Sequence, residues 1–68
     1  MDIVDALRQT QRERGETNAA FAKSLGISTS MLRQVYKGER KPGLAVLKGL
    51  CRLAAHRTPY VILYLQEE

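Results

Sequence analysis

The feature that most constrains this fold is a pair of short amphipathic segments separated by about three residues. Thr17 is a good N-cap for a helix that ends at Gly26, and Ser28 can cap a second helix that ends at Gly38. Both segments are only eight or nine residues long. Two short helices joined by a tight turn that contains glycine predict a helix-turn-helix over about residues 18–37.

The rest of the chain is also helical by its hydrophobic spacing. An N-terminal segment stops at Gly15, and between residues 44 and 54 a leucine recurs at every third position, so we expect this helix to face the core. Thr58 and Pro59 predict the start of a short apolar helix at about 59–66. No alternating strand pattern, repeat or linker interrupts the 68 residues. The sequence predicts one all-α domain of five helices over residues 1–68.

Positive charge is concentrated in the middle of the chain. The net charge is +4, but residues 17–57 hold eight cations and one anion, whereas the two ends hold six of the seven acids. A basic field of this kind favours a polyanionic partner. We expect the acidic ends to stay away from that partner.

The segment 17–53 contains an FAKSLGIS turn, the apolar pair Leu32 and Val35, and Gly38 four residues before Pro42. In this order and spacing, these features resemble the Cro/cI-type (XRE-like) helix-turn-helix family of phage repressors and bacterial regulators. The resemblance implies a five-helix, lambda-repressor-like domain. The chain departs from common family residues at three positions: Asn18 stands in place of Gln, Tyr36 in place of Glu, and Gly43 in place of Ser or Thr.

In this architecture the second helix of the motif lies in the major groove of DNA, with its N-terminal residues nearest the bases. Leu32 and Val35 face inward, which leaves the polar side chains outward. Glutamine can bind adenine and arginine can bind guanine through two hydrogen bonds each. In the alternative interpretation, these positions merely begin the helix or lie in solvent. The predicted base-reading residues are Thr29, Ser30, Arg33 and Gln34.

Phosphate contacts are expected around that helix, because they set the register of a protein on DNA. Asn18 begins the preceding helix, where its amide and the free backbone N–H groups can both meet a phosphate. The resembled family uses the loop after the second helix, and an ordinary solvated charge run is the alternative there. The predicted phosphate-contacting residues are Asn18, Lys37, Arg40 and Lys41. About half of Lys23, Lys48, Arg52 and Arg57 are expected to be ordinary surface.

Six consecutive apolar residues, 60–65, cannot all point inward from a short helix in so small a domain. The resembled family often dimerises through this region, which implies a homodimer on a palindromic operator with half-sites about 34–36 Å apart. Alternatively, the helix caps the core and the chain dimerises only on DNA. The predicted dimer interface is Tyr60, Val61, Tyr64 and Leu65.

The sequence contains no pattern typical of catalysis, metal binding or membrane insertion. The chain has one cysteine, Cys51, and one histidine, His56, too few for a four-ligand zinc site, and it has no catalytic motif. We expect Cys51 to be a small buried residue, and Tyr36 to pack under the basic loop. We therefore expect no enzyme activity, no metal, no cofactor and no small-molecule ligand. The absence of an export signal and of a membrane span predicts a cytoplasmic protein, in the bacterial nucleoid or in the host cytoplasm for a phage protein.

The leading hypothesis is a sequence-specific double-stranded DNA-binding transcriptional regulator, a Cro-like repressor that blocks polymerase by occupying an operator. Activation is equally compatible with these residues. The alternative is an antitoxin-like or phage-encoded protein-interaction module, which uses the same fold and binds DNA weakly or not at all. A steep fall of DNA affinity with salt distinguishes the first hypothesis from the second.

Overall fold

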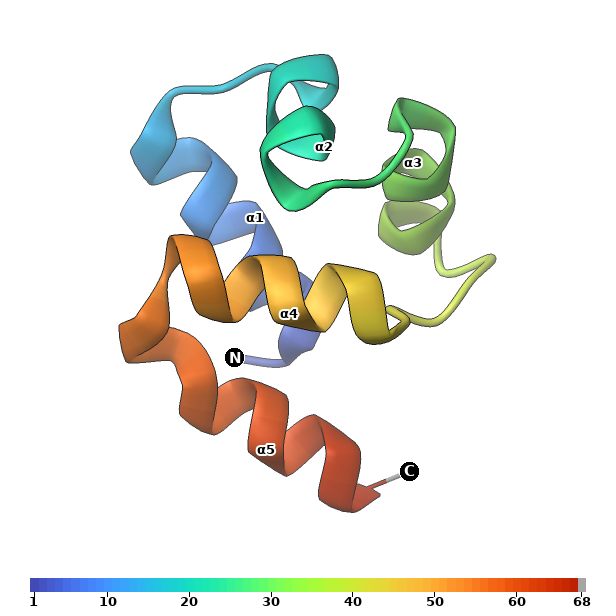
Figure 1. Ribbon diagram of the computed structural model, residues 1–68. Coiled ribbons are helices and arrows are strands. Elements are labelled where there is room, and N and C mark those ends of the chain that lie inside the picture. Colours follow the sequence, from blue (N-terminus) through green and yellow to red (C-terminus); the bar gives the residue numbers. More distant parts are fainter. Residues whose placement is uncertain (68) are drawn as a thin grey trace.

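The computed structural model describes residues 1–67, and over this range the chain forms α-helices with no strand. The all-α, five-helix prediction is confirmed. A single 3-10 turn, η1, precedes the last helix. The elements are α1 (Ile3–Arg14), α2 (Asn18–Leu25), α3 (Thr29–Lys37), α4 (Leu44–Leu53), η1 (Ala55–Arg57) and α5 (Thr58–Glu67) (Figure 1).

The predicted caps of α2 and α3 are present. The Thr17 hydroxyl accepts a hydrogen bond from the backbone N–H of Ala20, and the Ser28 hydroxyl accepts one from that of Met31. Gly26 and Gly38 follow the two helices with φ angles of 86° and 79°, a left-handed conformation that favours glycine. The boundaries of the helix-turn-helix therefore follow from local capping chemistry.

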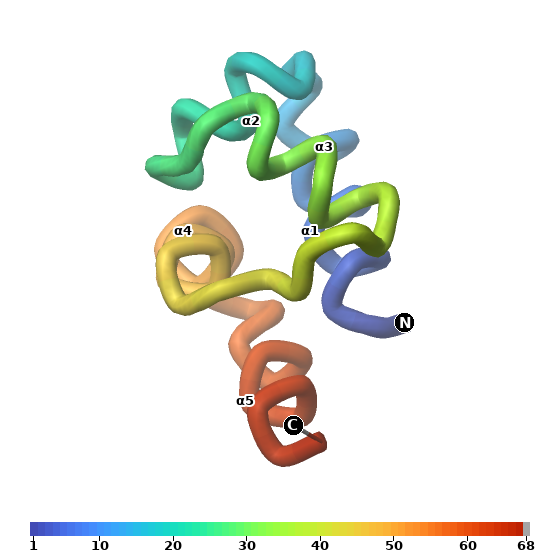
Figure 2. Tube along the Cα trace, turned by 90° about the vertical axis from the view of Figure 1, so that its right-hand side faces the viewer, coloured from blue at the N-terminus to red at the C-terminus, as the bar shows by residue number. Residues whose placement is uncertain are grey.

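The last four helices are arranged along the molecule, and α1 packs against both α4 and α5. α2 and α3 lie together at one end, α4 crosses the middle, and α5 lies at the opposite end (Figures 1 and 2). The core between them is apolar and draws fully buried side chains from each of the first four helices. The largest of these are Leu7, Phe21, Leu25, Leu32, Leu50, Val35 and Val46.

α4 approaches α2 so closely that only glycine fits at the contact. A Cβ atom built on Gly49 would lie 2.7 Å from the carbonyl oxygen of Leu25, a distance that side-chain carbons do not tolerate. Gly49 is itself buried. The helix-turn-helix is therefore seated on the middle of α4 through a backbone contact, which helical periodicity alone does not predict.

α4 faces the core through Leu47 and Leu50, as its spacing predicts, whereas Leu44 is 65% exposed. An α-helix turns about 100° per residue, so a three-residue step falls about 60° short of a full turn. After three such steps, Leu53 lies on the side of the helix opposite Leu44. The buried positions are instead Val46, Leu47 and Leu50. Cys51 is only half-buried, which corrects its expected burial.

The last helix begins at Thr58, one residue earlier than expected. Thr58 has helical φ and ψ angles of −51° and −38°, and its hydroxyl donates to the carbonyl oxygen of Ala55. It continues the preceding 3-10 turn and is not an N-cap. The structure therefore places α5 at Thr58–Glu67 rather than at 59–66.

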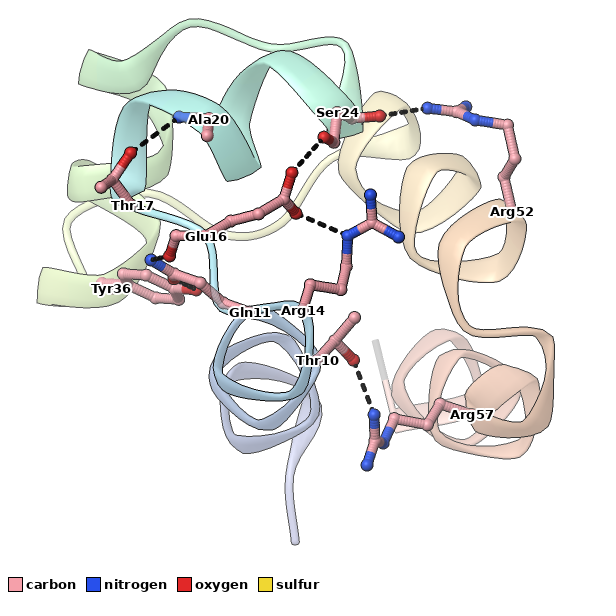
Figure 3. A network of polar contacts seen from close by, with 10 residues as sticks. All are labelled: Thr10, Gln11, Arg14, Glu16, Thr17, Ala20, Ser24, Tyr36, Arg52 and Arg57. Carbon is pink, nitrogen blue, oxygen red and sulfur yellow. Dashed lines mark hydrogen bonds and ion pairs between the residues drawn. The ribbon is translucent and has the colours of Figure 1, made fainter.

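An ion pair ties α1 to η1. Both terminal nitrogens of Arg57 donate to the Glu13 carboxylate at 2.7 Å, and one of them also donates to the Thr10 hydroxyl at 2.9 Å (Figure 3). Arg57 is 8% exposed. The hydrogen bonds from Arg57 lower the pKa of Glu13 to about 2. Arg57 is therefore a structural residue and not part of the cationic surface.

Candidate nucleic-acid interface

α3 presents its polar side to solvent, in the orientation that the spacing predicts. Leu32 and Val35 are buried against the core. Ser30, Arg33 and Lys37 are exposed, whereas Thr29 and Gln34 are half-buried. The four expected base-reading residues thus lie on the part of α3 that remains accessible, and their contacts with bases stay predictions.

Asn18 is the first residue of α2, and one half of its amide is already used. Its Oδ1 accepts a hydrogen bond of 2.8 Å from Nε2 of Gln11. No acceptor within residues 1–67 binds the Asn18 N–H2 group. The side chain is therefore able to donate to a phosphate oxygen, a contact that stays a prediction, and it is held in place by Gln11 of α1, to which the sequence pattern gives no role.

The loop between α3 and α4 carries two of the expected phosphate contacts. Arg40 and Lys41 are exposed, while the following Pro42 is buried. The Tyr64 hydroxyl donates to the carbonyl oxygen of Pro42 at 3.4 Å. The loop is thus held against α5 at Pro42, and its two exposed cationic residues directly precede that contact.

Several cations are engaged within the fold. Arg14 forms an ion pair with Glu16 and lowers the pKa of that carboxyl group, and Ser24 also donates to the Glu16 carboxylate (Figure 3). Arg52 donates to the carbonyl oxygen of Ser24. Other cations are exposed and make no ion pair within the described part of the chain. These are Lys23, Arg33, Lys37, Arg40 and Lys48.

Tyr36 does not pack under the basic loop, which corrects the sequence expectation. Its hydroxyl donates to Oε1 of Gln11 at 2.6 Å, and the Arg8 guanidinium lies 4.2 Å from the ring centre. Arg8 also donates to the Tyr36 carbonyl oxygen at 3.1 Å. Tyr36 therefore packs toward α1. No regular spacing links positions so far apart in the sequence, so the sequence carries no signal for this contact.

Polar side chains from α1, α2 and α3 surround an open concavity of about 300 Å³. Two arginines of α1 contribute to it, although this end of the chain was expected to stay away from nucleic acid. It is lined by Arg8, Gln11, Arg12, Glu16, Asn18 and Tyr36.

The expected dimer residues do not share one surface. Val61 is 6% exposed and belongs to the core of its own chain, and Tyr60 and Tyr64 pack against that core. Leu65 is 54% exposed. Ile62 and Leu63 are about half exposed as well, which confirms that not all six apolar residues point inward. Val61 is therefore mainly a core residue that reaches the surface only at the groove between α4 and α5, and its place in the interface stays a prediction.

A shallow apolar groove of about 240 Å³ lies between α4 and α5. It is lined by Leu44, Leu47, Lys48, Cys51, Val61 and Leu65.

Within residues 1–67, no group of three or more potential metal ligands comes together. None of the helices in this range is both long enough and apolar enough to cross a membrane.

Over 42 residues, the chain is 38% identical to YazB of Bacillus subtilis (strain 168), an uncharacterized HTH-type transcriptional regulator. The alignment covers 62% of this chain and 61% of YazB, so the chain spans about three fifths of the length of this relative. No family model matches the sequence, and no solved structure matches it. Together with the helix-turn-helix geometry, the similarity supports a helix-turn-helix regulator as the class of protein.

Proposed function

We propose that this chain is a sequence-specific double-stranded DNA-binding transcriptional regulator that inserts α3 into the major groove. The exposed polar and cationic side of α3 carries this proposal, because its opposite side is buried and a cationic loop follows directly. This arrangement suits a helix that enters a groove lined with phosphates. The similarity to an HTH-type transcriptional regulator supports the same function.

Within this proposal, sequence is read by the exposed N-terminal and central part of α3, through Thr29, Ser30, Arg33 and Gln34. Phosphates are bound around it by Asn18, Lys37, Arg40 and Lys41. Arginine and glutamine discriminate bases by paired hydrogen bonds, whereas the flanking cations bind any sequence.

The finer proposal is a Cro-like repressor that occupies a palindromic operator as a homodimer. The exposed apolar residues Ile62, Leu63 and Leu65 support dimerisation through α5, with Tyr60 and Tyr64 at its edge. One chain measures 29 × 25 × 18 Å, so the span of two chains joined through α5 exceeds one turn of DNA. One turn is about 34–36 Å.

Selection of binding sites from a random duplex pool tests the proposal most directly. We expect a two-fold symmetric consensus whose half-sites are about one helical turn apart. Affinity for the selected duplex should then fall steeply with salt. The slope of log affinity against log salt concentration should be about −0.9 for each phosphate contact. Failure to enrich any sequence, with weak and salt-independent binding, would contradict the proposal and favour a protein-interaction module. The variant Arg40→Ala should lower the salt slope without altering the consensus.

A further inference from the structure

A chain of hydrogen bonds between three side chains connects α3 to the start of α2 through α1. The Tyr36 hydroxyl donates to Oε1 of Gln11 at 2.6 Å, and Nε2 of Gln11 donates to Oδ1 of Asn18 at 2.8 Å. Figure 3 shows the Tyr36 and Gln11 side chains meeting at this point. The candidate base-reading helix is thus linked to a candidate phosphate contact on a different helix.

The partners of Gln11 permit only one orientation of its amide. Its Nε2 also donates to the carbonyl oxygen of Glu16 at 3.1 Å, and a carbonyl oxygen can only accept. The Tyr36 hydroxyl donates to the remaining polar atom of this amide, Oε1, and burial raises the pKa of Tyr36 to about 12. The Asn18 amide must therefore turn its oxygen to Gln11. Its N–H2 group, which no acceptor within residues 1–67 binds, is left for an acceptor on a partner.

The concavity beside Asn18 offers positive charge as well as donors. Arg8 and Arg12 both line it. Its acidic residue, Glu16, already accepts hydrogen bonds from Arg14 and Ser24. The Arg8 guanidinium is held over an aromatic ring, which fixes a charge that would otherwise swing freely. An anion whose oxygens only accept hydrogen bonds suits this set of groups.

We propose that Tyr36 and Gln11 are positioning residues, which present the Asn18 amide and the Arg8 guanidinium to one backbone phosphate of DNA. This inference rests on the proposed DNA binding. Tyr36 acts twice, because its hydroxyl orients Gln11 and its ring holds Arg8. The phosphate-binding surface thereby extends onto α1. Docking of α3 in the groove and binding of this phosphate then depend on the same tyrosine.

A double-mutant cycle on the full chain tests the hydrogen-bond chain. Binding is measured by fluorescence anisotropy on the selected operator and on a random duplex. Tyr36→Phe should weaken binding to both duplexes about three- to tenfold, the usual effect of one lost hydrogen bond. In the Asn18→Ala background, the same change should cause no further loss. Equal losses in both backgrounds would mean that the hydroxyl acts only on the fold, and would overturn the proposal.

A second variant keeps the test independent of any folding defect in Tyr36→Phe. In Gln11→Glu, the carboxylate cannot donate to Asn18, so the Asn18 amide turns over and directs its oxygen at the phosphate. We expect more than about tenfold weaker binding, because a repulsive contact replaces a hydrogen bond. The matched control is Gln9→Glu, which adds the same charge to α1 at a residue outside the concavity. Similar losses in the two variants would overturn the proposal.

The salt dependence of DNA binding tests the role of Arg8 separately from that of Tyr36. Removal of one cation–phosphate contact in Arg8→Gln should make the slope shallower by about 0.9, whereas Tyr36→Phe retains the ring and should keep the original slope. An unchanged slope in Arg8→Gln overturns the assignment of a phosphate to this concavity. If the unmodified chain binds neither duplex, the proposed function itself fails. If it binds and the variants bind equally well, only the positioning role fails.

Discussion

The two ends of the molecule expose opposite chemistry from helices of similar length. α3 turns Leu32 and Val35 inward and leaves polar and cationic side chains in solvent. α5 has one buried residue, Val61, and leaves Ile62, Leu63 and Leu65 about half exposed. α4 lies between these two ends (Figure 1).

The difference comes from the number of apolar residues relative to the surface that each helix can bury. A helix on a small core turns one stripe of side chains inward. α3 has enough apolar residues for that stripe, whereas α5 has six in succession and therefore leaves some in water. Burying a leucine side chain is favourable by about 1.5–3 kcal/mol. The α5 end therefore gains free energy from an apolar partner, and the α3 end from a polyanion.

The largest expected effect separates the buried residue of α5 from an exposed one. Val61→Asp should lower the free energy of unfolding by about 3–5 kcal/mol, because it buries an unpaired charge. Leu65→Asp places the same charge on an exposed position and should leave the stability nearly unchanged. Urea unfolding followed by circular dichroism measures both effects.

One variant of this pair also tests the proposed dimer. Leu65→Asp should abolish self-association in analytical ultracentrifugation while the monomer remains folded. An unmodified chain that sediments as a monomer, even on its selected operator, would refute dimerisation through α5.

The second expected effect concerns the contact that seats the α2–α3 end on α4. Gly49→Ala places a Cβ atom against the Leu25 backbone and should lower the free energy of unfolding by about 2 kcal/mol, within the usual range for overpacking. Gly43→Ala is the matched control, because nothing lies within 4 Å of its Cβ position and its φ is −86°. Thermal unfolding of both variants measures the difference. Equal destabilisation would show that α2 and α4 can move apart at little cost.

Much of the fold was predictable because it depends on local rules. Thr17, Ser28 and the glycines after the first three helices are capping residues, and caps act within one turn of the chain. The inward direction of Leu32 and Val35 follows from helical periodicity. The outward side of α3, and hence the accessible positions of the four candidate base-reading residues, was predictable for the same reason.

The main side-chain contacts that the sequence did not indicate join distant parts of the chain. Arg57 reaches Glu13 across 44 positions, and Tyr36 reaches Gln11 across 25. Gly49 is required only because Leu25 of another helix lies against it. Such contacts depend on how the helices dock, and docking is decided by the shape of the whole core. The roles of Arg57 and Tyr36 therefore emerged only from the three-dimensional arrangement.

A third and smaller effect tests the α3 end. Gln34→Ala should cost about 1–2 kcal/mol on the selected operator and relax the preference at one base pair, because a paired hydrogen bond to adenine is lost. Binding to a panel of single-base operator variants measures this. Arg40→Ala should instead weaken every duplex alike. If Gln34→Ala keeps both the affinity and the base preference, α3 sits in the groove in a different register.

The smallest expected effect is a pH dependence at the link between α1 and η1. Glu13 has its pKa lowered from 4.5 to about 2, chiefly by hydrogen bonds from Arg57. Because the pKa in the folded state lies below that of the unfolded chain, the ion pair stabilises the fold fully above about pH 4.5, and this contribution is lost as the pH falls toward 2. The melting temperature of the unmodified chain should therefore decrease over that interval. In Arg57→Met, which fills similar space without charge, the melting temperature should change less over the same interval. An identical decrease in both proteins would assign the acid sensitivity to carboxylates other than Glu13.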